Sequence, residues 1–253
     1  MELVEFFGAD KVITFMLLFV RLSGLIVFFP FYSHNQTPMV VKTLLVFALC
    51  VVLFPLSHAH EHAINFLIME ILSEAMLGLC AGLLLNIVFA ILQMAGEQIS
   101  MIMGFSMASV LDPQTGTNSP VIANILNFIA LLAFLMLDGH HLILQFYSAS
   151  LSAIPLGDFY PRSGVMSYAL KLFGNLFMFG FVLAFPIIAL SILSDAIFGM
   201  LMKTMPQFNL LVVGYPIKVS IGFSVLIAIL AGIIKIITDM MVQILNDMPA
   251  LFF

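Results

Sequence analysis

The chain has 253 residues, of which 63% are hydrophobic and only 8% are charged, and its mean hydropathy is +1.20. Ordinary soluble domains contain about 25% charged residues, so this composition excludes a water-soluble globular domain. Eight basic and 13 acidic residues give a net charge of −5, which excludes the basic surface of a nucleic-acid-binding protein.

Apolar windows of about 18 residues or more, each long enough to cross a bilayer as a helix, recur along the chain. They predict an all-α, polytopic membrane protein of about six helices that forms a single domain over residues 1–253. The expected helices cover residues 12–29, 39–56, 63–103, 121–137, 168–197 and 219–237, with a short apolar piece that ends at residue 154. The N-terminal residues lack the basic region and cleavage site of a secretory signal, so we expect the first helix to be retained.

Two basic residues lie inside the first two apolar runs. Arg21 is in the middle of the first run and Lys42 is near the start of the second. A charge at the centre of a bilayer costs at least about 2.5–3.5 kcal/mol, so we expect both side chains to face protein or water. Because the loops before residue 121 contain no Lys or Arg, the positive-inside rule indicates no orientation.

The third expected helix has one polar face. Residues at successive steps of four share this face: Glu70, Glu74, Gly78, Gly82 and Asn86, with Gln93 and Glu97 on the continuing polar side. Neighbouring carboxylates repel and need water or a partner, and small residues four apart let another backbone approach closely. This face has three interpretations: packing within one bundle, contact with other chains, or a proton relay.

The segment 104–121 is the longest polar stretch of the chain. Its only charged residue is Asp112, while Pro113, Gly116 and Pro120 break helices and favour turns. Non-helical backbone at membrane depth is tolerated only where it is buried in protein or lines a cavity. Three methionines near the loop form a candidate deformable apolar seal: Met101, Met103 and Met107.

Other polar clusters do not indicate chemistry. The loop with His58, His60 and His62 does not have the ligand spacing of a closed zinc site, and 138–141 reads as a helix-ending turn. No catalytic or nucleotide-binding motif is present in the sequence, so we expect neither an enzyme nor a cofactor or metal. Cys50 and Cys80 are expected to be buried thiols.

Three stretches resemble the FliR family of export-gate proteins, in the family's order along nearly the whole chain. They are "RLSGLIVFFPFYSHNQTP", "GEQISMIMGFSMASVLDPQTGTNSPV" and "MPQFNLLVVGYPIKVSIGF". The third is the most specific, and its motif residues are Pro206, Gln207, Asn209, Gly214, Pro216 and Lys218. The family serves bacterial flagella and has SctT-type relatives in injectisomes, and the middle stretch favours the flagellar branch.

The resemblance implies a place in the flagellar basal body, at the bacterial inner membrane. Family members form hairpins of partly broken helices and complete a closed helical assembly with FliP-type and FliQ-type subunits, beside FlhB-type and FlhA-type export proteins. Unfolded flagellar proteins leave the cytoplasm through its pore. The implied plug loop spans residues 104–121 and includes Phe105, Ser106, Met107, Asp112, Pro113, Gln114, Gly116, Asn118 and Pro120.

The same resemblance gives a reason for polar groups within apolar helices. In such an assembly they are buried against other subunits: Arg21, Lys42, Glu70, Glu74, Gly78, Gly82, Asn86 and Glu97. The alternative from another class is a self-contained secondary transporter or ion channel that uses Glu70, Glu74 or Glu97 as its ion site. We find no inverted repeat of the kind that many transporters have.

Overall fold

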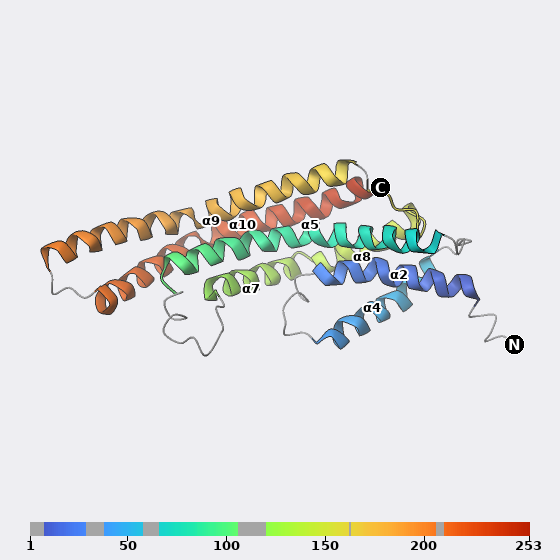
Figure 1. The fold of residues 1–253 in the computed structure, drawn as a ribbon, viewed down its shortest axis with the longest axis horizontal. Coiled ribbons are helices and arrows are strands. Elements are labelled where there is room, and N and C mark those ends of the chain that lie inside the picture. Colours follow the sequence, from blue (N-terminus) through green and yellow to red (C-terminus); the bar gives the residue numbers. More distant parts are fainter. Residues whose placement is uncertain (1–7, 29–37, 58–65, 106–119, 162, 206–209) are drawn as a thin grey trace. The chain divides into compact units, whose positions relative to one another are not determined.

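The computed structural model describes residues 8–28, 38–57, 66–105, 120–161, 163–205 and 210–253 (Figure 1). These residues contain α-helices and no strand. The α-helices are α2 (Ala9–Phe28), α4 (Met39–Leu53), α5 (Leu67–Ile102), α7 (Val121–Met136), α8 (Gly139–Ala153), α9 (Ser163–Thr204) and α10 (Tyr215–Phe252). A short 3₁₀ turn, Phe54–Leu56, follows α4, and a π-helical turn, Leu210–Gly214, precedes α10.

Five of these helices are long and apolar enough to cross a membrane, and the pair α7 and α8 adds a sixth candidate span. The prediction of an all-α, polytopic membrane protein is therefore confirmed. The chain places helices where the apolar windows lie, because buried backbone without water must form its hydrogen bonds internally.

Three helices are longer in the structure than the sequence predicted. The piece that ends at residue 154 is a full helix, α8, and both α9 and α10 extend well beyond the expected 168–197 and 219–237. Charged residues such as Lys235 and Asp239 lowered the hydropathy of the window but lie on exposed positions of α10. A helix tolerates charge on its exposed face, so the apolar window marked only part of each helix.

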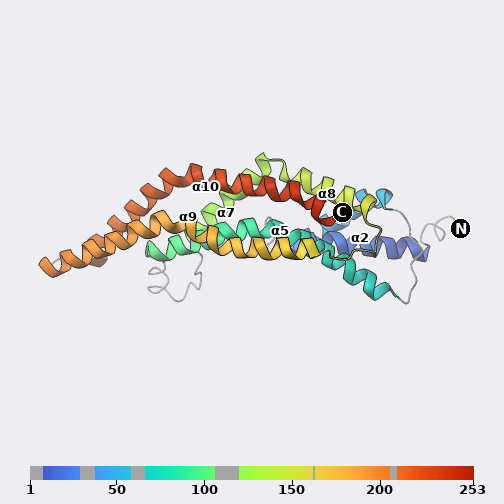
Figure 2. The same ribbon diagram turned by 90° about the horizontal axis from the view of Figure 1, so that it is seen from above.

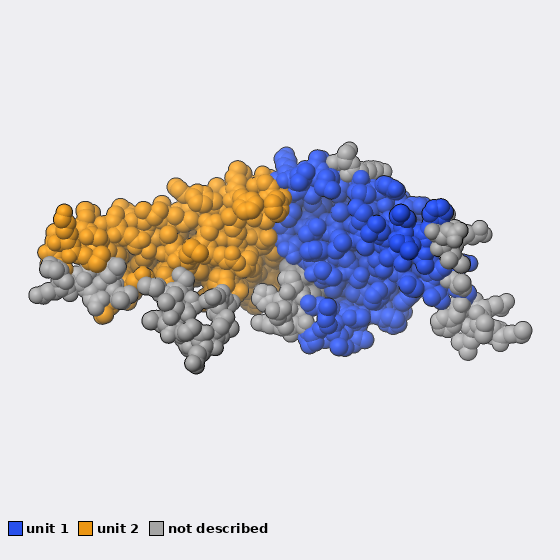
Figure 3. Space-filling view, viewed as in Figure 1, with its two compact units in different colours: residues 1–87, 134–172, 241–253 blue, residues 88–133, 173–240 orange. Residues whose placement is uncertain are grey.

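The chain divides into two compact units, coloured separately in Figure 3. Unit 1 contains Met1–Ile87, Phe134–Leu172 and Met241–Phe253, and unit 2 contains Val88–Ala133 and Phe173–Met240. Helices α5, α7, α9 and α10 contribute residues to both units.

In unit 1, α2 lies along the first half of α5 (Figure 1). The contact is close because Gly24 of α2 meets the backbone of Gly78, where a Cβ would lie 2.8 Å from the Gly78 carbonyl carbon. At the other end of the chain, α10 ends beside α8 (Figure 2). There Phe252 is buried and its ring contacts those of Phe146 and Phe159, at centroid distances of 5.4 and 5.8 Å.

In unit 2, the second half of α5 packs with α7 and α10. Their facing side chains are apolar: Leu92 on α5, Leu126 and Ala130 on α7, and Ile233 and Ile237 on α10. Burial of each leucine and isoleucine side chain supplies about 1.5–3 kcal/mol, and it joins the two helices that flank the central loop to α10.

Candidate functional site

The base of the central loop is built in unit 2, where α5 ends. Gly104 has φ 89°, and a Cβ there would lie 2.7 Å from Cε1 of the Tyr215 ring. Left-handed backbone favours glycine, and the ring leaves no room for a side chain. The chain therefore leaves α5 through a turn that only glycine fits, directly against the first residue of α10.

Two further contacts fix this end of the loop. Met103 is fully buried, and its Cε lies 2.7 Å from the position of a Cβ at Gly222. Phe105 meets Phe223 edge to face, with ring centroids 6.0 Å apart. Aromatic pairs in this arrangement add about 0.5–1.5 kcal/mol beyond their burial. The start of α10 thus acts as a platform for the last residues before the loop.

The other end of the loop is anchored on α5. The backbone N–H of Ile122 donates a hydrogen bond of 3.3 Å to Ser100 Oγ. A Cβ at Gly96 would overlap the backbone of Ala123, so α5 and α7 approach closely here. The first end of the loop is consequently held by the start of α10, and the second end is held by the last two turns of α5.

A polar chain continues along the same pair of helices. Asn127 Nδ2 donates to Gln93 Oε1, and Gln93 Nε2 donates to Glu97 Oε1 at 2.6 Å. Glu97 is exposed on this chain, so its expected burial against another subunit remains a prediction. The Glu97 carboxylate accepts a hydrogen bond from the Gln93 side-chain amide and lies at the surface of the chain.

The structure separates the described members of the candidate methionine seal. Met103 is buried against α10, whereas the side chain of Met101 is 71% exposed. Met107 lies outside the described residues. Met103 packs into the base of the loop. Of these two methionines, only Met101 is accessible to lipid or to another protein.

Most of the predicted plug residues lie outside the described residues: Ser106, Met107, Asp112, Pro113, Gln114, Gly116 and Asn118. The two that are described, Phe105 and Pro120, are half-buried at the two ends of the loop. The plug therefore stays a prediction, and the structure supplies the geometry of its base.

The motif near the C-terminal part of the chain is described from Gly214 onward, since Pro206, Gln207 and Asn209 lie outside the described residues. Gly214 is buried at the end of the π-helical turn, and Pro216 is in the first turn of α10, where its missing N–H is not needed. Lys218 Nζ contacts both carboxylate oxygens of Asp195 on α9 at 2.8 Å.

Asp195 was not singled out by the sequence, although its charge within an apolar helix was the available signal. Tyr215, Gly222 and Phe223 were also missed as members of the loop base. They lie within the third family-like stretch, but only their contacts with Met103, Gly104 and Phe105 assign them a role.

In unit 1, the sequence-predicted polar residues form a buried cluster. Arg21 donates through Nε and Nη2 to the two oxygens of Glu74, with Nη2 2.8 Å from Oε1, and both side chains are fully buried. Nη1 of Arg21 also donates to the hydroxyl and carbonyl oxygens of Ser150, each at 3.3 Å. The cluster is a neutralised pair, which is the form in which charges are tolerated in protein interiors.

The loop after α8 completes this cluster. The N–H of Gly157 donates to Glu74 Oε1 at 2.7 Å, and its carbonyl accepts from Ser73 Oγ at 2.8 Å. Gly157 has φ 96° and lies against the Glu70 side chain, so a larger residue would be strained there and would clash. The carboxylates of this helix face thus position the segment between α8 and α9.

The remaining residues of the face pack against α2 of the same chain. A Cβ at Gly78 would overlap the carbonyl oxygen of Arg21, and Gly82 lies against Phe28. Asn86 Nδ2 donates to the Phe28 carbonyl at 2.8 Å, at the end of α2. Of the three interpretations, packing within the bundle is the one that the structure displays at these positions.

Lys42 and Glu70 are half-buried on this chain. Their contact with other subunits, like that of Glu97, remains a prediction.

The chain matches the family model described as bacterial export proteins, family 1, over residues 12–244. It is 33% identical over 234 residues to the flagellar biosynthetic protein FliR of Bacillus subtilis (strain 168), covering 89% of each chain. It is 27% identical over 229 residues to FliR of Escherichia coli (strain K12), covering 90% of this chain and 88% of that one. FliR of Aquifex aeolicus (strain VF5) is 27% identical over 222 residues, covering 86% and 85%.

Proposed function

The chain belongs to the FliR family of bacterial export proteins, in its flagellar branch, and from this membership we propose that it is a pore-forming structural subunit of the flagellar type III protein export gate. In this role it helps unfolded flagellar proteins to leave the cytoplasm. The loop of residues 104–121 acts as a plug of the pore. The match over residues 12–244 is the observation that carries the proposal.

The exposed surface of the chain supports an assembled state. In α4, α9 and α10 most residues of the apolar windows are not buried by the chain itself. Large side chains such as Phe177, Phe181 and Phe185 of α9 are about half exposed. Such surfaces need lipid or partner proteins, and FliP-type and FliQ-type subunits are the partners we propose, with FlhB-type and FlhA-type proteins beside them.

The base of the loop supports the plug. Ser100, Gly104 and Tyr215 hold both ends of the loop against packed helices, so a plug mounted there has a fixed origin. The polar segment 106–119 contains no Lys or Arg and would not retain acidic cargo by charge. We propose that this segment closes the pore at rest, in the inner membrane part of the flagellar basal body.

The geometry favours this role over the ion-site alternative. Both oxygens of Glu74 already accept hydrogen bonds from Arg21, and Oε1 also accepts from Gly157. A carboxylate occupied in this way is a structural group. We therefore propose that Glu74 has a structural role rather than that of an ion site.

Native mass spectrometry of a gently solubilised preparation tests this function. The tagged chain is co-expressed with the neighbouring export genes and extracted in mild detergent. We expect one copy within a large hetero-oligomer of small membrane proteins. A chain that remains a monomer or forms a symmetric homo-oligomer would contradict the gate and favour a transporter.

A further inference from the structure

The turn between α7 and α8 in unit 1 has an unusual backbone. Asp138 has φ 53°, the only positive φ of a non-glycine residue among the described residues. It holds the N-cap position of α8, yet its carboxylate makes no capping hydrogen bond. Aspartate at this position normally caps the helix from an extended backbone, so the left-handed backbone of Asp138 leaves its carboxylate available for other contacts.

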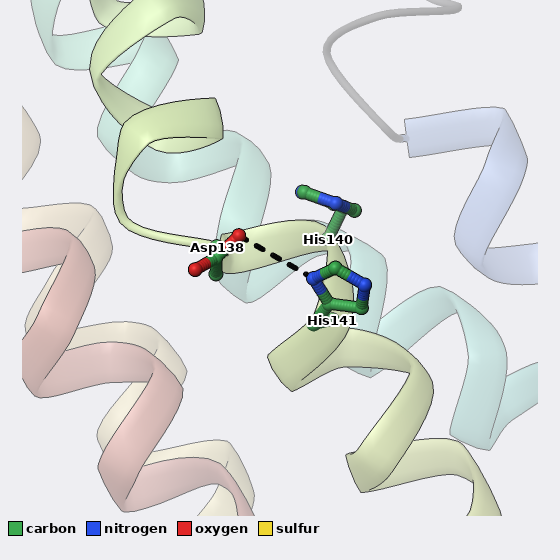
Figure 4. A group of neighbouring side chains, drawn as sticks. All are labelled: Asp138, His140 and His141. Atoms are coloured by element: carbon green, nitrogen blue, oxygen red, sulfur yellow. Dashed lines mark hydrogen bonds and ion pairs between the residues drawn. The ribbon is translucent and has the colours of Figure 1, made fainter.

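One carboxylate oxygen of Asp138 is directed at His141, and the ring of His140 lies beside that of His141 (Figure 4). Nδ1 of His141 lies 3.4 Å from Asp138 Oδ1, and the rings of His140 and His141 have centroids only 4.2 Å apart. One ligand atom from each of the three residues lies within 4.8 Å of the others. Two imidazoles and a carboxylate therefore share one small volume at the surface.

The spacing fits a metal ion. Zn²⁺ holds nitrogen and oxygen ligands at about 2.0–2.2 Å in a tetrahedron, which places neighbouring ligand atoms about 3.4 Å apart. Asp138 and His141 already have this separation. The third ligand atom, from His140, lies within 4.8 Å of these two and would have to be at the same spacing when an ion is bound.

An unpaired ring nitrogen of His140 is the second observation that points to a ligand. Its Nδ1 is buried and has no hydrogen-bond partner among the described residues. Buried polar atoms are nearly always satisfied, so a buried ring nitrogen without a protein partner has a lone pair or N–H available to an added ligand. His141 and Asp138 are 64% and 73% exposed, which gives an ion a path from solvent.

We propose that Asp138, His140 and His141 form a binding site for a late first-row divalent cation, of which Zn²⁺ is the representative. Imidazole and carboxylate ligands suit such ions, and water completes an open coordination position. This site is independent of the export function proposed above. A bound ion would clamp the turn that joins α7 to α8, where Gly139 is packed directly on the Phe134 ring.

Zinc titration of the purified full chain in detergent tests the proposal. The chain carries an affinity tag without histidine, is stripped with a chelator, and competes for Zn²⁺ with a chromophoric chelator. Co²⁺ absorption reports the coordination geometry. The variants are Asp138→Asn, His141→Ala and His140→Ala, and the matched control replaces the other histidine cluster, at residues 58, 60 and 62, by alanine.

We expect one ion per chain and visible Co²⁺ bands in the natural chain. Loss of an outer hydrogen-bond partner weakens metal sites by about 10–100-fold, so loss of a ligand should weaken binding at least tenfold in D138N and H141A. Both of these side chains are exposed, and circular dichroism verifies that the helices persist. Absence of saturable binding, or binding lost only in the control variant, overturns the proposal.

Discussion

Arg21 on α2 and Glu74 on α5 form a two-point ion pair in which both side chains are completely inaccessible to solvent. The pair joins residues 53 positions apart and also holds Ser150 and Gly157. One contact therefore links α2, α5, α8 and the segment after α8. It explains how a charge inside the first apolar run is retained.

The ion pair predicts an asymmetry between single and double substitutions. Arg21→Met or Glu74→Gln should each lower the free energy of unfolding by about 3–5 kcal/mol, because each leaves its partner buried and unmatched. The double variant Arg21→Met with Glu74→Gln removes both charges and should regain most of this loss. Thermal unfolding of the purified chain in detergent measures the three variants.

A double variant that is as unstable as the two single losses added together would contradict the pairing. That result would mean that each side chain stabilises the fold through separate contacts.

The glycine contact between α2 and α5 predicts a steric effect. Gly78→Val should lower the unfolding temperature, because its side chain would overlap the backbone of Arg21, and overpacking costs about 1–3 kcal/mol or more. Gly174→Val is the matched control, since a Cβ at Gly174 meets nothing within 4 Å. Equal unfolding temperatures for the two variants would contradict the packing of α2 on this face.

The plug predicts a permeability phenotype. Deletion of residues 114–119 shortens the loop without touching its base at Ser100, Gly104 or Tyr215. We expect cells with this deletion to leak ions, measured by membrane-potential dyes, while the partner subunits still co-purify with the chain. An equally long glycine–serine replacement is the control for loop length. Unchanged permeability in the deletion with intact assembly would exclude the plug.

The end of α10 predicts a stability effect from a single ring. Phe252 is 2% exposed between Phe146 and Phe159, so Phe252→Ala should cost about 3–5 kcal/mol. Phe173→Ala is the control, because Phe173 is 55% exposed on the isolated chain. Chemical unfolding in detergent compares the two. A larger loss for Phe173→Ala would contradict the docking of α10 on α8.

Several features were readable from the sequence because they are local. The scarcity of charge and the length of the apolar windows determined the class of protein, and proline and glycine marked the polar loop after α5. The steps of four from Glu70 to Asn86 correctly placed these residues on one helix face. The family-like stretches indicated the FliR family, which the comparisons confirm.

Only the tertiary structure decided what each of these residues contacts. Arg21 pairs with Glu74, Lys218 pairs with Asp195, and Gly78 meets the backbone of α2. Hydrophobic period and turn propensity depend on neighbouring residues, whereas these contacts depend on how distant helices pack. The tertiary structure also decided the full length of α10. Its charged residues are tolerated because they lie at exposed positions, whereas a hydropathy window averages exposed and buried positions together.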